Sequence, residues 1–252
     1  MALTNNNQGI IRIGISNTVV PGIKKDFPPP YNLRSRLNYY SSIFNTIEVN
    51  SCFYKTPMLK TYERWAADVP EDFQFTLKLS KEVTHVKELK GELACMNTFI
   101  QNAGALGHKK GCLLIQFPGK ITLDYFEQVE SILYHLEKED ASKEWKKAIE
   151  FRSPTWYIRE TWEMLDEYAA TMVLHDKSKA KLTEFGGNAS FVYLRFHGPK
   201  GDYRGSYEDS FLKDKAEEIR QWIMNGKDVY AYFNNTAGNA YENAFTLKSM
   251  LT

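Results

Sequence analysis

The sequence predicts an α/β protein, a single (β/α)8 barrel with parallel strands, and three observations lead to this class. Eight short runs of β-branched and aromatic residues recur along the 252 residues, helical patterns lie between most of them, and several runs are apolar at nearly every position. Continuous apolar strands are typical of parallel sheets covered on both faces. Eight strands alternating with helices over about 250 residues match the size of a (β/α)8 barrel.

The eight predicted strands are bounded by polar or turn-forming residues. Two runs, CLLIQF and FVYLRF, are almost wholly apolar, which favours burial on both faces. In chain order the predicted strands cover residues 11–16, 46–51, 74–79, 111–117, 147–152, 171–176, 191–198 and 228–235.

Apolar residues at helical spacing predict six helices, over residues 33–44, 59–69, 93–100, 126–136, 212–223 and 240–251. Thr56 before Pro57 predicts a capped start of the second helix, and Gly226 predicts the end of the fifth. Between the sixth and seventh strands only Leu182 and Phe185 are spaced apolar residues. We therefore expect an irregular crossover there.

An open, doubly wound sheet is the alternative architecture. Its dinucleotide-binding form carries G-x-G-x-x-G after the first strand, whereas SNTVVPG follows the first strand here. A Walker phosphate loop is also absent from the sequence, and no repeat or shift in composition marks a domain boundary. The sequence predicts one domain over residues 1–252, with residues 1–9 as a disordered tail.

Composition narrows the class of protein further. Hydrophobic residues make up 43% and the formal net charge is +1, so a sizeable core is expected and broad, charge-driven nucleic-acid binding is not. The first residues lack the pattern of a secretory signal, and no apolar run is long enough to cross a bilayer. We expect a soluble, cytoplasmic protein with no membrane partner, in which Cys52, Cys95 and Cys112 are small buried hydrophobes.

Polar side chains gather at the predicted carboxyl ends of the strands, the face where barrel loops converge and reactive groups lie. Because alternate residues of a strand share a face, their positions predict which side chains enter the mouth of the barrel together. The pairs that share a face are Glu48 with Asn50, Glu150 with Arg152, Arg195 with His197, and Tyr232 with Asn234.

Buried charges need partners, so we expect a network in which Glu48 and Glu150 are balanced by Lys78, Arg152 and Arg195. Such a network could serve only to close the top of the barrel. Apolar side chains would close it at lower cost in desolvation, which favours a functional role.

The residue types suggest roles in catalysis. Glu48 and Glu150 are the predicted acid and base, with cations keeping one ionised and burial keeping the other protonated. His197 is a proton carrier near neutral pH, and Arg152 and Arg195 are clamps for an anion. Asn234 and Asn235 would orient hydroxyl groups, and Phe53, Tyr54 and Trp156 would form a wall for a sugar ring or base.

A metal site is a separate possibility, since the histidines and carboxylates at the strand ends are common ligands. The spacing does not specify one: there is no H-E-x-x-H motif, and the adjacent His175 and Asp176 should point to opposite faces. We predict no metal and no cofactor.

Two functions from different classes fit these residues. The first is a hydrolase or lyase that uses acid–base chemistry on a small anionic or polyhydroxylated substrate. The second is a nucleic-acid-binding protein or barrel nuclease, because Lys177, Lys179 and Lys181 follow a strand end and would overhang the mouth. A scaffold without catalysis is the third reading. The sequence indicates no oligomeric state.

The strand-end motifs FNTIEVNSCFYKTP, FTLKLSKEVTH, LLIQFP, AIEFRSPTW, VYLRFHG and YAYFNNTAGNAYENA resemble those of the YecE-like family, a domain of unknown function (DUF72) with a TIM-barrel fold. The resemblance runs from about Ile11 to the C-terminus, and the order of the motifs makes it specific. It implies no reaction. It implies a barrel whose polar mouth contains Glu48, Asn50, Tyr54, Lys78, His85, Gln116, Glu150, Arg152, Trp156, Arg195, His197, Asn234 and Asn235.

One motif departs from the family pattern. Family members often carry G-x-S-G-W after the first strand, whereas this chain has Gly14-Ile15-Ser16-Asn17-Thr18. We therefore expect the ligand contacts of this first loop to differ.

Overall fold

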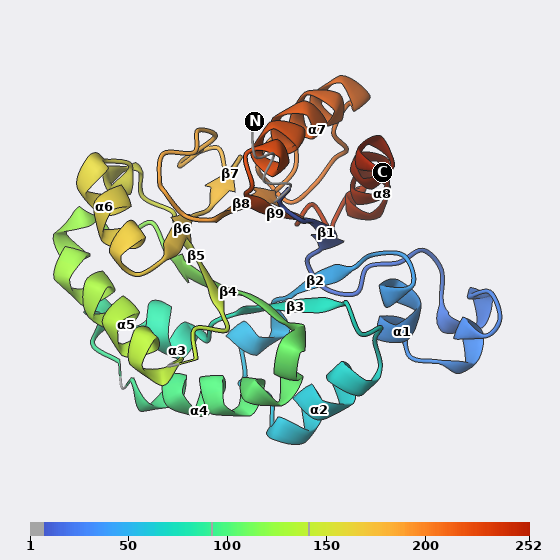
Figure 1. Ribbon diagram of the computed structural model, residues 1–252, viewed down its shortest axis with the longest axis horizontal. Coiled ribbons are helices and arrows are strands. Elements are labelled where there is room, and N and C mark those ends of the chain that lie inside the picture. Colours follow the sequence, from blue (N-terminus) through green and yellow to red (C-terminus); the bar gives the residue numbers. More distant parts are fainter. Residues whose placement is uncertain (1–7, 92, 141) are drawn as a thin grey trace, which may run out of the picture.

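Two parallel sheets form the centre of the protein in a computed structural model that describes residues 8–91, 93–140 and 142–252 (Figure 1). All eight predicted strands are present, and the sixth is split into two. One sheet has the order β1 (Ile11–Ile15), β9 (Asp228–Phe233), β8 (Phe191–Phe196), β7 (Leu174–His175). The other has the order β2 (Thr46–Val49), β3 (Gln74–Lys78), β4 (Lys110–Phe117), β5 (Lys146–Phe151), β6 (Ala170–Met172).

The two sheets follow one another in the order of a TIM barrel, which confirms the predicted fold class. On one side, β6 and β7 are parts of one stretch of chain interrupted at Val173, whose N–H donates to Ile149 of β5. On the other side, β1 and β2 share a single bridge between Ser16 and Glu48. The strands therefore surround a common interior, although the hydrogen-bonded ladder is interrupted at both junctions.

Gly14 and Tyr40 hold β1 against β2 where the ladder is missing. A Cβ atom at Gly14 would lie 2.3 Å from the carbonyl oxygen of Thr46, so only glycine permits this approach. The buried Tyr40 hydroxyl accepts a hydrogen bond from Ile15 N (2.8 Å) and donates one to Thr46 O (2.9 Å). A side chain thus pairs backbone groups that a neighbouring strand would otherwise satisfy.

Helices surround the strands (Figure 1). The six predicted helices are confirmed, and α3 and α6 were not predicted. The α-helices are α1 (Arg36–Ser41), α2 (Leu59–Ala67), α3 (Lys81–Thr84), α4 (Ala94–Ala103), α5 (Phe126–Glu139), α6 (Arg159–Glu167), α7 (Asp209–Met224) and α8 (Ala240–Leu251). Short 3₁₀ turns cover Lys24–Asp26, Tyr31–Leu33, Ser51–Phe53, Lys87–Leu89, Gly104–Lys109, Leu123–Tyr125 and Pro154–Trp156.

The structure corrects one helix boundary and confirms two other local features. The predicted cap at Thr56 is wrong, because the chain is still extended at Met58 (ψ 153°) and α2 begins after it. Gly226 ends α7 as predicted, with φ of +78° and its N–H donating to Ile223 O. The link between β7 and β8 is irregular, since Leu182 folds back to form an antiparallel bridge with His175.

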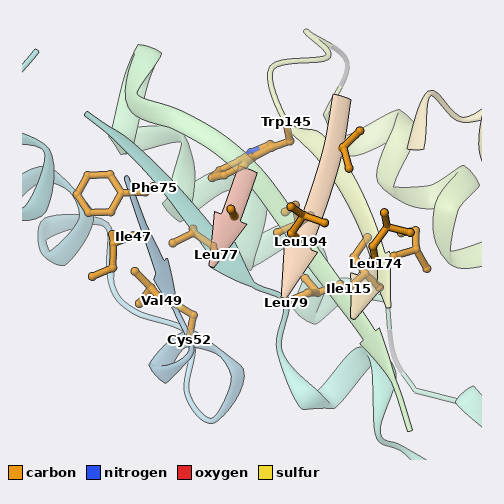
Figure 2. Close-up of a cluster of buried hydrophobic side chains, with 14 of the residues drawn as sticks. Ile47, Val49, Cys52, Phe75, Leu77, Leu79, Ile115, Trp145, Leu174 and Leu194 are labelled. Atoms are coloured by element: carbon orange, nitrogen blue, oxygen red, sulfur yellow. The ribbon is translucent and has the colours of Figure 1, made fainter. Parts of the chain in front are cut away.

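Apolar side chains form two layers, one inside the barrel and one between the strands and the helices. Alternation along β2 sends Ile47 and Val49 outward into the second layer, which Figure 2 shows, while Glu48 points inward. Inside lies a smaller cluster made of Cys112, Leu114, Ala148, Val173, Ala189, Phe191, Tyr193, Tyr230 and Tyr232. Cys52 and Cys112 are buried as predicted, and Cys95 is partly buried.

Two further predictions concern the start of the chain and helices that could cross a membrane. The predicted tail falls mainly on residues 1–7, which lie outside the described residues; from Gly9 onward the backbone is anchored, with Gly9 N donating to Ile223 O (2.9 Å). Of the helices in the described ranges, none has both the length and the apolar character to cross a bilayer.

We expect Tyr40→Phe to lower the free energy of unfolding by about 1–3 kcal/mol, because it leaves Ile15 N and Thr46 O buried without their partner. Urea denaturation measures the change. Tyr134→Phe is the matched control, since Tyr134 lies on the surface of α5 and is 53% exposed. Equal unfolding midpoints for wild type and Tyr40→Phe would contradict this account of the β1–β2 junction.

Candidate active site

Arg195, near the end of β8, lies at the centre of a buried ion cluster. Its side chain is 2% exposed and contacts two fully buried carboxylates. It binds Glu48 in a bidentate manner, with Nε 2.9 Å from Oε2 and Nη2 2.7 Å from Oε1. Its remaining nitrogen, Nη1, lies 2.5 Å from Oε2 of Glu150. One guanidinium therefore joins β8 to β2 and β5.

Both carboxylates have further partners. Glu48 accepts hydrogen bonds from Ser16 Oγ (2.6 Å), Tyr193 OH (2.7 Å) and Asn50 Nδ2 (3.2 Å). The other oxygen of Glu150 forms an ion pair with Nε of Arg152. The predicted network of Glu48, Glu150, Arg152 and Arg195 is thus assembled as alternation along the strands indicated, with Lys78 outside it.

The pKa values of Glu48 and Glu150 contradict their predicted roles as acid and base. Burial alone would raise the pKa of Glu48, but the charge and hydrogen bonds of Arg195 outweigh burial and hold that pKa below its usual value. Burial would also raise the pKa of Glu150, which the charges of Arg152 and Arg195 hold well below its usual value. Both carboxylates are therefore ionised, and neither is kept protonated by burial as we had expected.

His197 is fully buried and has no ring nitrogen free for the predicted proton transfer. Arg152 Nη2 donates to its Nε2 (3.1 Å), so the ring proton lies on Nδ1 and faces Asp176 Oδ1 at 3.3 Å. Burial lowers the pKa of His197 despite its hydrogen bond to Asp176. Tyr207 OH also donates to this carboxylate. We conclude that the neutral His197 holds Arg152 in place rather than facing a ligand.

A polar pocket of about 270 Å³ lies over this cluster, at the carboxyl ends of the strands. We call it the mouth pocket. Tyr203, on the loop after β8, is a lining residue that the sequence did not point to, because nothing in its loop repeats or alternates. The lining residues are Asn17, Asn50, Phe53, Tyr54, Lys78, Gln116, Arg152, Arg195, Tyr203 and Asn234.

Lys78, the last residue of β3, differs from the two arginines of the pocket. Its Nζ donates to Gln116 Oε1 (3.0 Å) and lies 4.0 Å from the centre of the Phe53 ring. Within the described part of the chain, no carboxylate oxygen lies within 4.0 Å of this nitrogen. Burial, together with the charge of Arg195, lowers the pKa of Lys78 to about 8. Lys78 therefore titrates close to neutral pH.

Besides Glu48, Glu150 and His197, which lie beneath the mouth pocket, three further predicted site residues do not line it. Trp156 is fully buried: its Nε1 donates to Ile121 O (2.8 Å) and its ring stacks on Phe151, so it belongs to the core and not to a ligand wall. Asn235 is also buried, because alternation after β9 turns it away from the mouth, where Asn234 lies. His85 packs edge-on against Phe53, with ring centres 4.8 Å apart.

The basic run after β7 is only partly at the mouth. Nζ of Lys177 donates to Gly201 O (2.6 Å) and lies 3.9 Å from the centre of the Tyr203 ring, whereas Lys181 lines cavities on the outer side of β7 and β8. In the ranges that the structure covers, no group of three or more His, Cys, Asp or Glu side chains is placed to hold a metal ion. A larger cavity of about 450 Å³ lies between β2 and α2, away from the ion cluster.

Comparison with known proteins gives consistent results. The family described as "Protein of unknown function DUF72" matches residues 12–252. The UPF0759 protein YunF of Bacillus subtilis is 23% identical over 245 residues, covering 84% of each chain. A DUF72 crystal structure from Thermotoga maritima has a TM-score of 0.76 at 24% identity, covering 96% of this chain and 99% of that one. Another from Enterococcus faecalis has a TM-score of 0.75 at 21% identity, covering 97% and 98%.

We expect Arg195→Met to lower the free energy of unfolding by about 3–5 kcal/mol, since it leaves Glu48 and Glu150 buried without their shared cation. Chemical denaturation measures the loss, with Arg159→Met on the surface of α6 as the control. Adding Glu48→Gln to Arg195→Met should recover part of the loss by removing one unpaired charge. A loss no larger than that of the control would refute the role of the cluster.

The buried His175 predicts a pH dependence of stability. Burial lowers its pKa to about 4 against an unfolded value near 6.5, so the folded chain binds fewer protons between these values. The associated stability is complete above about pH 6.5 and is lost as the pH falls toward 4. We expect His175 to account for a loss of about 2 kcal/mol between pH 7 and 5.

Denaturation of wild type and His175→Gln at both pH values measures this contribution, and the variant should lose less stability on acidification. His108→Gln serves as the control, because His108 is on the surface and its side chain is 63% exposed. An unchanged pH dependence in His175→Gln would contradict the assignment.

Proposed function

This chain belongs to the DUF72 family, and we propose that it is an enzyme acting on a small polyhydroxylated or anionic substrate in the mouth pocket. The observation that carries the proposal is the arrangement of a polar pocket directly over a buried ion cluster, with one titratable amine in its wall. In TIM-barrel enzymes, active sites lie at this end of the strands. A volume of about 270 Å³ suits a small ligand.

The lining favours a substrate rich in hydroxyl groups. Carboxamides offer both donors and acceptors, which is what hydroxyl groups need on both sides. The pocket has four such side chains, from Asn17, Asn50, Gln116 and Asn234. Phe53 and Tyr54, whose ring centres are 5.1 Å apart, add an aromatic surface for the apolar face of a sugar-like molecule.

The charges favour an anionic group on the same molecule. Glu48 and Glu150 contribute two negative charges, while Arg152, Arg195 and a protonated Lys78 contribute three positive charges, which leaves one positive charge in excess. The carboxylates hold the two arginines in fixed positions. Of these five groups, Lys78 alone can change its charge without breaking an ion pair.

Lys78 is the group in this pocket suited to acid–base chemistry. Its pKa of about 8 lies near the operating pH, where proton transfer is most effective. Glu48 and Glu150, which we had expected to act as acid and base, would instead stabilise the cations of the site. Proton transfer of this kind suits a hydrolase or a lyase.

A thermal-shift screen of sugars, sugar acids, sugar phosphates, nucleotides and short single-stranded DNA tests the proposal. A compound at about 100 times its Kd adds about 2.7 kcal/mol to the stability. We expect hydroxylated or anionic small molecules to raise Tm, and Asn234→Ala to weaken their binding by about three- to tenfold through the loss of one hydrogen-bonding group.

Asn225→Ala, at the exposed end of α7, is the matched control and should leave binding unchanged. Stabilisation by DNA alone, erased by moderate salt, would replace the enzyme proposal with nucleic-acid binding, since phosphate contacts release counterions. No stabilisation by any small molecule would overturn the proposal.

A further inference from the structure

We propose that Lys78 reacts covalently with the substrate: its amine attacks an aldehyde or ketone carbonyl held in the mouth pocket and forms a Schiff base. This inference rests on the proposed function of the same pocket and narrows the substrate class to small hydroxylated or anionic carbonyl compounds.

The first support for this reaction is the position of Lys78. It ends β3, so its backbone is fixed in the sheet, and its side chain lines the mouth pocket. Its Nζ donates to a neutral acceptor, Gln116 Oε1, and is not held by a carboxylate as Arg152 and Arg195 are. An amine that loses its proton here therefore breaks no ion pair.

The second support is the environment of the Lys78 amine. A lysine becomes a nucleophile when a desolvated site or a neighbouring cation disfavours its ammonium form. Burial and the cations Arg195 and Arg152 disfavour it here, and together they outweigh Glu150 and Glu48. Phe53 covers one side of the amine with an apolar ring.

A further titratable neighbour of Lys78 is His85, whose ring packs edge-on against Phe53. Burial and the charge of Lys78 lower the pKa of His85 to about 4, so it is neutral when Lys78 titrates. With a pKa of about 8, about a quarter of Lys78 is neutral at about pH 7.5, compared with roughly a thousandth of an ordinary lysine.

The step balances without an external oxidant or reductant. The nitrogen lone pair forms a bond to the carbonyl carbon, and the carbonyl oxygen takes up a proton as the amine loses one, which yields a carbinolamine. Loss of the hydroxyl group with a second proton then releases water and leaves a carbon–nitrogen double bond. Asn50, Gln116 and Asn234 line the same pocket and offer amide N–H groups to the oxygens of the substrate.

Reductive trapping tests the inference. The full chain is incubated with glyoxylate or glycolaldehyde and sodium cyanoborohydride, which delivers hydride to the imine carbon, and the modified lysines are identified by peptide mass spectrometry. We expect Lys78 to be modified about tenfold faster than the exposed Lys81 of α3 at about pH 7.5, with a midpoint near pH 8. Faster trapping of glyoxylate than of glycolaldehyde would assign the anionic class of carbonyl, and the reverse the hydroxylated class.

Lys78→Met should remove this fast modification and leave that of Lys81 unchanged. Modification of Lys78 no faster than that of Lys81 overturns the covalent step. If hydroxylated or anionic compounds without a carbonyl still raise Tm in that case, the proposed binding function survives and only the Schiff base is wrong. If they do not, both proposals fail.

Discussion

The pairing of one guanidinium with two buried carboxylates is the constraint on which the carboxyl-terminal end of this barrel depends. Arg195 belongs to the sheet of β1, β9, β8 and β7, whereas Glu48 and Glu150 belong to the sheet of β2 to β6. Because the ladder is interrupted between these sheets, the ion cluster connects them across the interior. A buried ion pair is not in itself a source of stability. In this structure it joins β8 to β2 and β5 across the interior.

The same pairing decides what chemistry is left for the mouth pocket. By satisfying both carboxylates, Arg195 and Arg152 remove them as proton donors. By satisfying Nε2 of His197, Arg152 removes the imidazole as well. The cluster is therefore a fixed set of charges. These charges act on the pKa of Lys78, the amine at the edge of the cluster. The charge of the site and its reactivity are both consequences of this arrangement.

The sequence predicted the strands, six of the helices and most of the residues that converge, because these depend on local periodicity. Alternation placed Glu48, Glu150 and Arg195 on the interior face. Their roles depend on contacts between residues far apart in the chain, such as Asp176 with His197 and Tyr207, which no local pattern encodes. Likewise, Trp156 donates a hydrogen bond to Ile121 O on another loop, and no local pattern predicts this contact.

The first loop shows how a departure from the family motif can be accommodated. Asn17 stands where the motif has glycine and adopts a left-handed conformation with φ of +69°. Asparagine tolerates this region better than most residues, so the turn survives the substitution while a carboxamide is added to the lining of the mouth pocket.

The single bridge between β1 and β2 places one of the two interrupted parts of the wall beside the pocket. There the amide of Ile15 is held by the Tyr40 hydroxyl, and the amide of Asn17 donates to Glu48 O (2.8 Å). Asn17 and Asn50 flank this junction and line the mouth pocket, so a side-chain hydroxyl, and not strand pairing, holds the wall of the entrance together there.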